Sequence, residues 1–410
     1  MGIRIQRLLV RRQVFILWSL HLMLAGVFLS RALLSIGMIA FLVFALVHPQ
    51  IRQQVKTFFQ NSWMVVLSLL FFLPLLSGLW SENLDKWTEV VRIKLPLFLF
   101  PLAFAGSWQF TKTKWRQLFH AFLLLTAIGC AWSFWQYLSN LSGINESYLR
   151  AKSIPTLFEN DHVRFSWVVA VAAGACFYIA LQATRPALWW ITGLFFAVYL
   201  HVLSARTGLL CFYVSIGLLF VQLLLRNRPK ALRYVPLLLL PLAAWLLLPT
   251  FRNRIAYILY DLSFIKKQAY LPGGNDGNRV QSFKAGWHIL RTNPLGVGAG
   301  DVQDNVNAWY TENVPGMLDS DKLLPSSEWL VYGAAAGWPG LILFTLGMLL
   351  PLMLPVPKHR LAWMTLNSIA ALSFLFDIGL EVQFGVFVYV FLILCCWKFL
   401  HIQNESLSRP

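Results

Sequence analysis

Two arginines stand in settings where a guanidinium can bind a phosphate. Arg206 lies between the small residues Ser204 and Gly208 at the edge of an apolar segment. Arg279 opens a predicted helix, where unpaired N–H groups already favour anions and an arginine does not help the helix dipole. A planar guanidinium suits the paired oxygens of a diphosphate. Both are candidate diphosphate ligands, although Arg206 could instead extend to lipid headgroups and Arg279 could pair with Asp276 or Asp301.

Three residues could act as an acid, a base or a further anion ligand. His162 and Arg164 enter an apolar segment together, directly after Asp161. His162 could serve as a base and Arg164 as a phosphate clamp, unless Asp161 merely caps an ordinary helix. Glu328 begins another apolar segment, where it is either a general base or an acid favoured by the first turn of a helix.

Two further motifs have weaker functional readings. Asp319 and Asp321 resemble the Asp-x-Asp that holds a metal in nucleotide-sugar transferases, but paired acids occur often in polar loops, and nothing nearby suits a nucleotide. The Gly-x-Gly-x-Gly run at 296–300 follows a helix and a proline, without the βαβ unit of a dinucleotide site. We expect a tight turn at these glycines, no metal and no cofactor.

Membrane-spanning helices must position these residues. The 410-residue chain is 58% hydrophobic and 12% charged, whereas soluble domains are roughly 25% charged. Each crossing needs about 20 apolar residues, which lipid forces into a helix. We predict an all-α, polytopic transmembrane helical bundle of about twelve spans that forms one domain, residues 1–410. The spans are placed at 14–30, 32–48, 63–80, 93–107, 117–139, 164–182, 187–203, 207–225, 233–249, 328–353, 360–377 and 382–400.

The net charge is +17, and the distribution of the charged residues between the two sets of connections indicates the orientation of the bundle. One alternate set of connections, together with both termini, carries about half of the 34 Lys and Arg residues but only Glu405 of the 17 acidic residues. Since Lys and Arg are retained in the cytoplasm during insertion, both termini are predicted to be cytoplasmic. The charge predicts contact with anionic membrane lipid and not with nucleic acid, because no basic groove interleaved with aromatic residues accompanies it.

Two connections on the opposite side are long enough to carry a site, residues 140–163 and 250–327. The second is a large outer loop between the ninth and tenth spans. Its apolar residues recur at helical spacing after Asn278, a plausible N-cap, and the run stops at Asn293. We expect an amphipathic helix there, lying on the membrane.

The order of these pieces resembles the O-antigen ligase and polymerase superfamily. The resemblance covers roughly 200–400, with a softer match around Glu89, Arg92 and Lys94. The matching residues are Ser204, Arg206 and Gly208 at a span edge, then Arg279 and Trp287, then Pro325 and Leu330 before a Gly-x-x-Gly helix.

The resemblance implies a metal-independent GT-C-type glycosyltransferase in the inner membrane of a bacterium. Its donor would be a glycan on polyprenyl diphosphate, and its acceptor lipid A-core or another glycan, on the periplasmic face. The matching arginines bind the donor diphosphate, a role that carries over to Arg206 and Arg279. The outer loop would then be periplasmic.

One position departs from the family pattern. Members usually carry a Pro-His-Asn-like motif whose histidine is a proposed base, but this chain has Pro325, Ser326 and Ser327 there. The predicted catalytic residues are therefore Glu328, His162 and Ser326, with Arg164 as a third diphosphate ligand.

Three functions are compatible with the sequence. Ligation of O-antigen to lipid A-core is preferred, and polymerisation of O-antigen or exopolysaccharide uses the same donor with another acceptor. A polysaccharide or lipid transporter or flippase is less favoured, because its inverted repeats and charged midspan residues are not visible.

Overall fold

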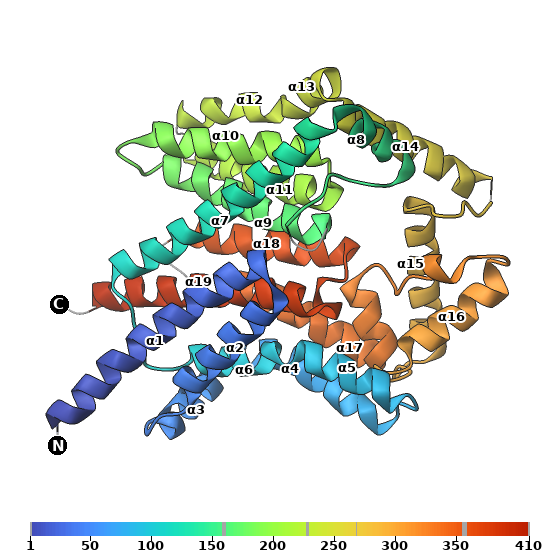
Figure 1. Cartoon of the computed structure of the whole chain (residues 1–410). Coiled ribbons are helices and arrows are strands. Elements are labelled where there is room, and N and C mark those ends of the chain that lie inside the picture. Colours follow the sequence, from blue (N-terminus) through green and yellow to red (C-terminus); the bar gives the residue numbers. More distant parts are fainter. Residues whose placement is uncertain (1, 158–160, 227–228, 268, 355–358, 409–410) are drawn as a thin grey trace.

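The computed structural model describes residues 2–157, 161–226, 229–267, 269–354 and 359–408. These residues form helices and turns with no β-strand, which confirms the all-α prediction. Long helices lie side by side, and both termini lie at one end of the bundle (Figure 1). The α-helices are α1 Gly2–Leu29, α2 Arg31–Leu46, α3 Ile51–Gln60, α4 Ser62–Leu76, α5 Leu84–Lys94, α6 Pro96–Phe104, α7 Lys112–Ser139, α8 Leu141–Ser147, α9 His162–Ala180, α10 Pro186–Leu203, α11 Arg206–Leu225, α12 Val235–Leu238, α13 Leu240–Leu247, α14 Pro249–Lys266, α15 Asp276–Thr292, α16 Val302–Asn313, α17 Glu328–Met353, α18 Arg360–Phe376 and α19 Gln383–Ser408.

Helix length and composition in the described residues do not confirm the predicted count of about twelve spans. Among the described residues, eight helices are long and apolar enough to cross a membrane, or up to ten if each of two bent pairs counts as one span. Prolines account for much of the difference, because a proline removes a helical hydrogen bond. Pro236 and Pro241 lie where the predicted span 233–249 divides into α12 and α13, and Pro96 separates α5 from the short α6.

The outer segment 250–327 is largely helical and packs on the bundle. In Figure 1, α15 and α16 lie at the end opposite the termini, with α15 running across the long helices. A second, smaller hydrophobic core joins α15 and α16 to α17, and includes Ala285, Ile289, Val306 and Tyr310. The helix expected after Asn278 begins earlier, at Asp276, and its buried face docks on protein.

The glycine run forms the turn that returns the chain to α17. Gly296 and Gly298 have positive φ angles of 82° and 93°. The N–H groups of Val297 and Gly298 donate to carbonyls of α17 at 2.8 and 3.0 Å. These carbonyls lie just before a kink at Gly337, whose φ is 66° and whose missing Cβ would lie 1.9 Å from a carbonyl oxygen of the same turn.

Candidate functional site

The first turn of α15 is held by a carboxylate from another helix. Asp261 of α14 is fully buried and accepts hydrogen bonds from the N–H groups of Asn275, Asp276 and Gly277 at 2.8, 2.7 and 3.2 Å. An anion in this position satisfies the free donors and the positive end of the helix dipole. Asn278 is not the N-cap expected from sequence, because its amide donates to the carbonyl of Gly274. Asn275 precedes the helix instead.

Arg206 begins α11 and pairs with that first turn. Its guanidinium donates to the carboxylate of Asp276, while 43% of its side chain is exposed. The neighbouring Gly208 lets another helix approach, since a Cβ there would lie 2.4 Å from Cβ of Ser166 in α9. Gly208 thus brings α9, which carries Arg164, against the start of α11.

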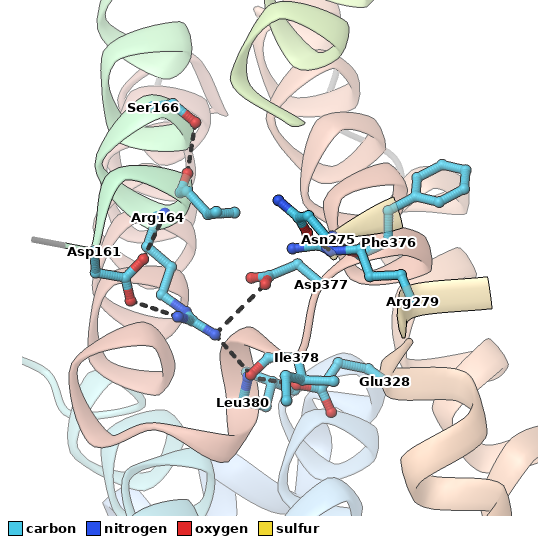
Figure 2. A network of polar contacts seen from close by, with 11 residues as sticks. Asp161, Arg164, Ser166, Asn275, Arg279, Glu328, Phe376, Asp377, Ile378 and Leu380 are labelled. Atoms are coloured by element: carbon cyan, nitrogen blue, oxygen red, sulfur yellow. Dashed lines mark hydrogen bonds and ion pairs between the residues drawn. The ribbon is translucent and has the colours of Figure 1, made fainter. Parts of the chain in front are cut away.

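Arg164 occupies the centre of a polar network (Figure 2). It pairs with Asp161, lies 3.5 Å from the carboxylate of Asp377, and donates to the carbonyl of Ile378 at 3.1 Å. Asp161 also accepts the Arg164 N–H at 3.1 Å, as an N-cap of α9 should. The segment between α18 and α19 therefore enters the site, which no motif in the sequence indicated.

Arg279 lies on the other side of Asp377 in Figure 2. Its guanidinium donates to the Asn275 amide oxygen at 3.2 Å and to the Phe376 carbonyl at 2.8 Å. Burial lowers the pKa of this guanidinium, and the positive charge of Arg206 lowers it further. The three arginines predicted from sequence are thus brought together at one end of the bundle.

A fourth arginine joins this group without having been predicted. Arg254 of α14 is buried, donates to the Lys152 carbonyl at 2.8 Å, and stacks its guanidinium 4.7 Å from the ring centroid of Tyr148. Its charge interacts with those of Arg206 and Asp276. Tyr148 belongs to the first outer segment, so both long outer connections contribute to one site. In the sequence, Arg254 is one of several basic residues after a proline, and nothing in its spacing distinguishes it.

Several buried polar atoms in this group have no partner in the described part of the chain. They are Nε of Arg164, Nε of Arg254 and one carboxylate oxygen of Asp276. Buried polar groups are nearly always hydrogen-bonded, so such a concentration calls for an explanation. An anionic ligand with several oxygens would satisfy the guanidinium donors.

Glu328 lies in a second, largely buried cluster next to the arginines. One oxygen accepts the N–H of Leu380 and the other has no partner in the described residues. Beside it, Lys94 pairs with Glu381, and the Lys94 ammonium lies 4.5 Å from the ring centroid of Tyr332. Glu328 has no exposed surface. This burial favours a role in holding the segment around Leu380, although the predicted catalytic role stays untested.

The other two predicted catalytic residues occupy different settings. His162 is the first residue of α9 and is half-buried, two positions from Arg164. Ser326 is buried, and its hydroxyl accepts a hydrogen bond from Ser282 at 2.8 Å. That bond ties α15 to the start of α17. Both catalytic assignments stay predictions.

The Asp-x-Asp carboxylates make contacts within the outer segment. Asp319 pairs with Lys322 at 2.7 Å, and Asp321 accepts from the Tyr270 hydroxyl and from the N–H of Gly273. Within the described ranges, no group of three or more His, Cys, Asp or Glu residues is arranged to hold a metal ion. Asp321 therefore links its own turn to the stretch around Tyr270 and Gly273, whereas Asp319 makes an exposed ion pair with a near neighbour in sequence.

The sequence was compared with models of protein families. Residues 191–345 match the model of the family described as O-antigen ligase. The matched region includes Arg206, Arg254, Arg279 and Glu328, whereas Arg164 lies before it. Comparison with curated proteins found no match.

Proposed function

We propose, starting from the match of residues 191–345 to the O-antigen ligase family, that the chain transfers a glycan from a polyprenyl diphosphate to an acceptor hydroxyl. The preferred acceptor is lipid A-core, at the periplasmic face of a bacterial inner membrane. The observation that carries the proposal is the convergence of four arginines from the four helices α9, α11, α14 and α15: Arg164, Arg206, Arg254 and Arg279.

The arginines suit the leaving group of this reaction. The bond between the sugar C1 and the diphosphate oxygen breaks, and its electrons remain on the diphosphate. Guanidinium groups held before the reaction begins stabilise that developing charge without further reorganisation. Asp276 and Asp377 pair with Arg206 and Arg164 in the structure, so donor binding would exchange carboxylate partners for phosphate oxygens. No metal is needed for this step, which agrees with a GT-C-type mechanism.

The acceptor oxygen bonds to C1 and loses its proton. His162 is our preferred base. It is the first residue of α9, two positions from Arg164, and its side chain is only half-buried, so an acceptor hydroxyl can reach it. Glu328, in contrast, has no exposed surface. An imidazole accepts a proton near neutral pH. Glu328 and Ser326 would then support the segments that carry the arginines.

The proposal can be tested by reconstituting the full chain in vesicles with a glycan on polyprenyl diphosphate, with and without chelator. Lipid A-core and a second carrier-linked glycan are supplied as separate acceptors. We expect product on lipid A-core in both conditions. Product only on the carrier-linked glycan would instead make the chain a polymerase, and no product on either acceptor would overturn glycan transfer.

Arginine variants locate the site in the same assay. Arg279→Ala should lower the transfer rate by about 100-fold, the usual scale for losing one preorganised donor to a developing charge. Arg291→Ala is the matched control, because Arg291 is exposed near the other end of the same helix. Equal rates for both variants would remove Arg279 from the donor site.

A further inference from the structure

A large apolar cavity lies at the opposite end of the bundle from the arginines. Its volume is about 400 Å³, within the range of ligand sites. It is lined by the first turns of α7 and α18, the second half of α9 and the middle of α19, with α11 behind them. This is the end that carries the C-terminus (Figure 1).

The cavity is separate from the donor site. Arg164 and Tyr178 both belong to α9, and their separation of 14 positions corresponds to about 21 Å of helix. Tyr178 lines the cavity, whereas Arg164 belongs to the arginine group. A diphosphate held by the arginines therefore cannot also occupy this space.

The lining is suited to a hydrocarbon chain. Most of it is aliphatic or aromatic, as in Phe122, Val171, Leu219, Ile369 and Phe391. Water is a poor occupant of such a space, and even an apolar cavity of roughly 150 Å³ binds small hydrocarbons. In a membrane-spanning protein, the hydrocarbon at hand is a lipid chain.

The few polar residues of the lining indicate what kind of lipid headgroup would fit beside the hydrocarbon chain. Arg116 is exposed in the first turns of α7 and lines the cavity together with Gln182. The Tyr178 hydroxyl and His359 Nδ1 form a hydrogen bond of 2.9 Å in the same wall. Lys112 and Lys114 lie four and two residues before Arg116 in sequence. Basic residues at a membrane surface attract anionic headgroups.

We propose that this cavity binds one acyl chain of an anionic phospholipid, with the headgroup phosphate facing Arg116. The site is independent of the glycan-transfer site and requires no donor. Its occupant comes from the leaflet at the end of the bundle where the termini lie.

Native mass spectrometry of the full chain tests the proposal. The protein is extracted from vesicles that contain phosphatidylglycerol and phosphatidylcholine with identical chains, and the retained lipids are counted. Ala175→Trp fills the cavity and should remove one retained lipid. Arg116→Gln should reduce the preference for phosphatidylglycerol by about fivefold, which corresponds to roughly 1 kcal/mol for one basic residue.

Two controls separate this site from general lipid contact. Ile128→Trp adds the same side chain on an exposed position of α7, and Arg52→Gln removes an exposed arginine of α3. Both should retain lipid as the unmodified chain does. Unchanged retention in Ala175→Trp, equal retention of the two phospholipids, or displacement of phosphatidylglycerol by polyprenyl phosphate would each overturn the proposal. Arg116→Gln lies on the surface, so its result stands even if Ala175→Trp fails to fold.

Discussion

Single side chains define the site through shared partners. Asp377 lies between Arg164 and Arg279. Asp276 forms an ion pair with Arg206 and lies in the first turn of α15, the helix that also contains Arg279. The arginines need not contact one another directly in order to lie close together, because the carboxylates between them form ion pairs with them. The arrangement keeps like charges close at a cost that the carboxylates offset.

Variants of Glu328 distinguish two roles for this residue: holding the segment around Leu380 in place, or accepting a proton as a general base. In Glu328→Gln, the amide oxygen can still accept the N–H of Leu380. Since a general base contributes roughly 10²–10⁴-fold, we expect Glu328→Gln to retain activity within about tenfold of the unmodified chain. Initial transfer rates measured across pH check this, and the shape of the profile should not change.

Glu328→Ala is the companion variant, because it leaves the Leu380 N–H without a buried acceptor and should lose far more activity. A loss above about 100-fold in Glu328→Gln, together with a flattened pH profile, would restore Glu328 as the base.

Sequence reasoning identified the arginines by their neighbours and missed what connects them. Arg206 and Arg279 stood out because of adjacent small residues and a helix start. Asp377 had no such signal, since it follows a predicted span as any polar residue does. Its role depends on the fold, which brings the end of α18 against α9 and α15.

At the scale of elements, α15 depends on a cap supplied by α14. Removing the charge of Asp261 weakens three hydrogen bonds to N–H groups and the interaction with the helix dipole. Asp261→Asn should destabilise the protein by about 1 kcal/mol, as for loss of a helix cap. Hydrogen exchange at residues 275–277 should increase in the same variant.

Asp319→Asn is the matched control, since the Asp319 side chain is almost fully exposed and pairs only with Lys322 among the described contacts. Protection at 275–277 that is the same in both variants would contradict the capping role of Asp261.

The kink in α17 depends on one glycine. Gly337 has a φ of 66°, and an added Cβ would lie 1.9 Å from the Pro294 carbonyl oxygen. Gly337→Ala should therefore destabilise the protein by at least about 1–3 kcal/mol, the usual cost of such backbone strain. Thermal unfolding in detergent measures the effect.

Gly217→Ala is the comparison, because Gly217 lies within α11 and its Cβ would meet nothing within 4 Å. This change should be neutral or stabilising by roughly 0.5–1 kcal/mol. If both variants melt alike, the turn against α17 does not require Gly337.

For the whole molecule, the two ends of the bundle should face opposite compartments. Ser320 and Thr113 are exposed, in the outer segment and at the start of α7. We expect Ser320→Cys to react with a membrane-impermeant thiol reagent in spheroplasts, and Thr113→Cys to react only after permeabilisation. The unmodified chain gives the background of its five cysteines. The reverse pattern would invert the predicted orientation.

The helical class was predictable from composition, whereas the number of spans was not. Apolar length predicts where a helix can cross a membrane, but prolines divide such a segment without lowering its hydrophobicity. The segments around Pro96 and Pro236 illustrate this, since each ends as short or bent helices. Only the packed fold decides whether such a piece crosses, bends or lies along the surface.

The pairing of Arg206 with Asp276 has one more consequence. A free inorganic anion arriving from the medium must compete with a carboxylate already tethered at the arginine, and it offers too few oxygens to engage the surrounding guanidinium groups. A diphosphate anchored in the bilayer brings many oxygens and does not diffuse away, so it can win that competition. Under the proposed function, Asp276 would therefore make Arg206 less accessible to small soluble anions than to a diphosphate held in the membrane.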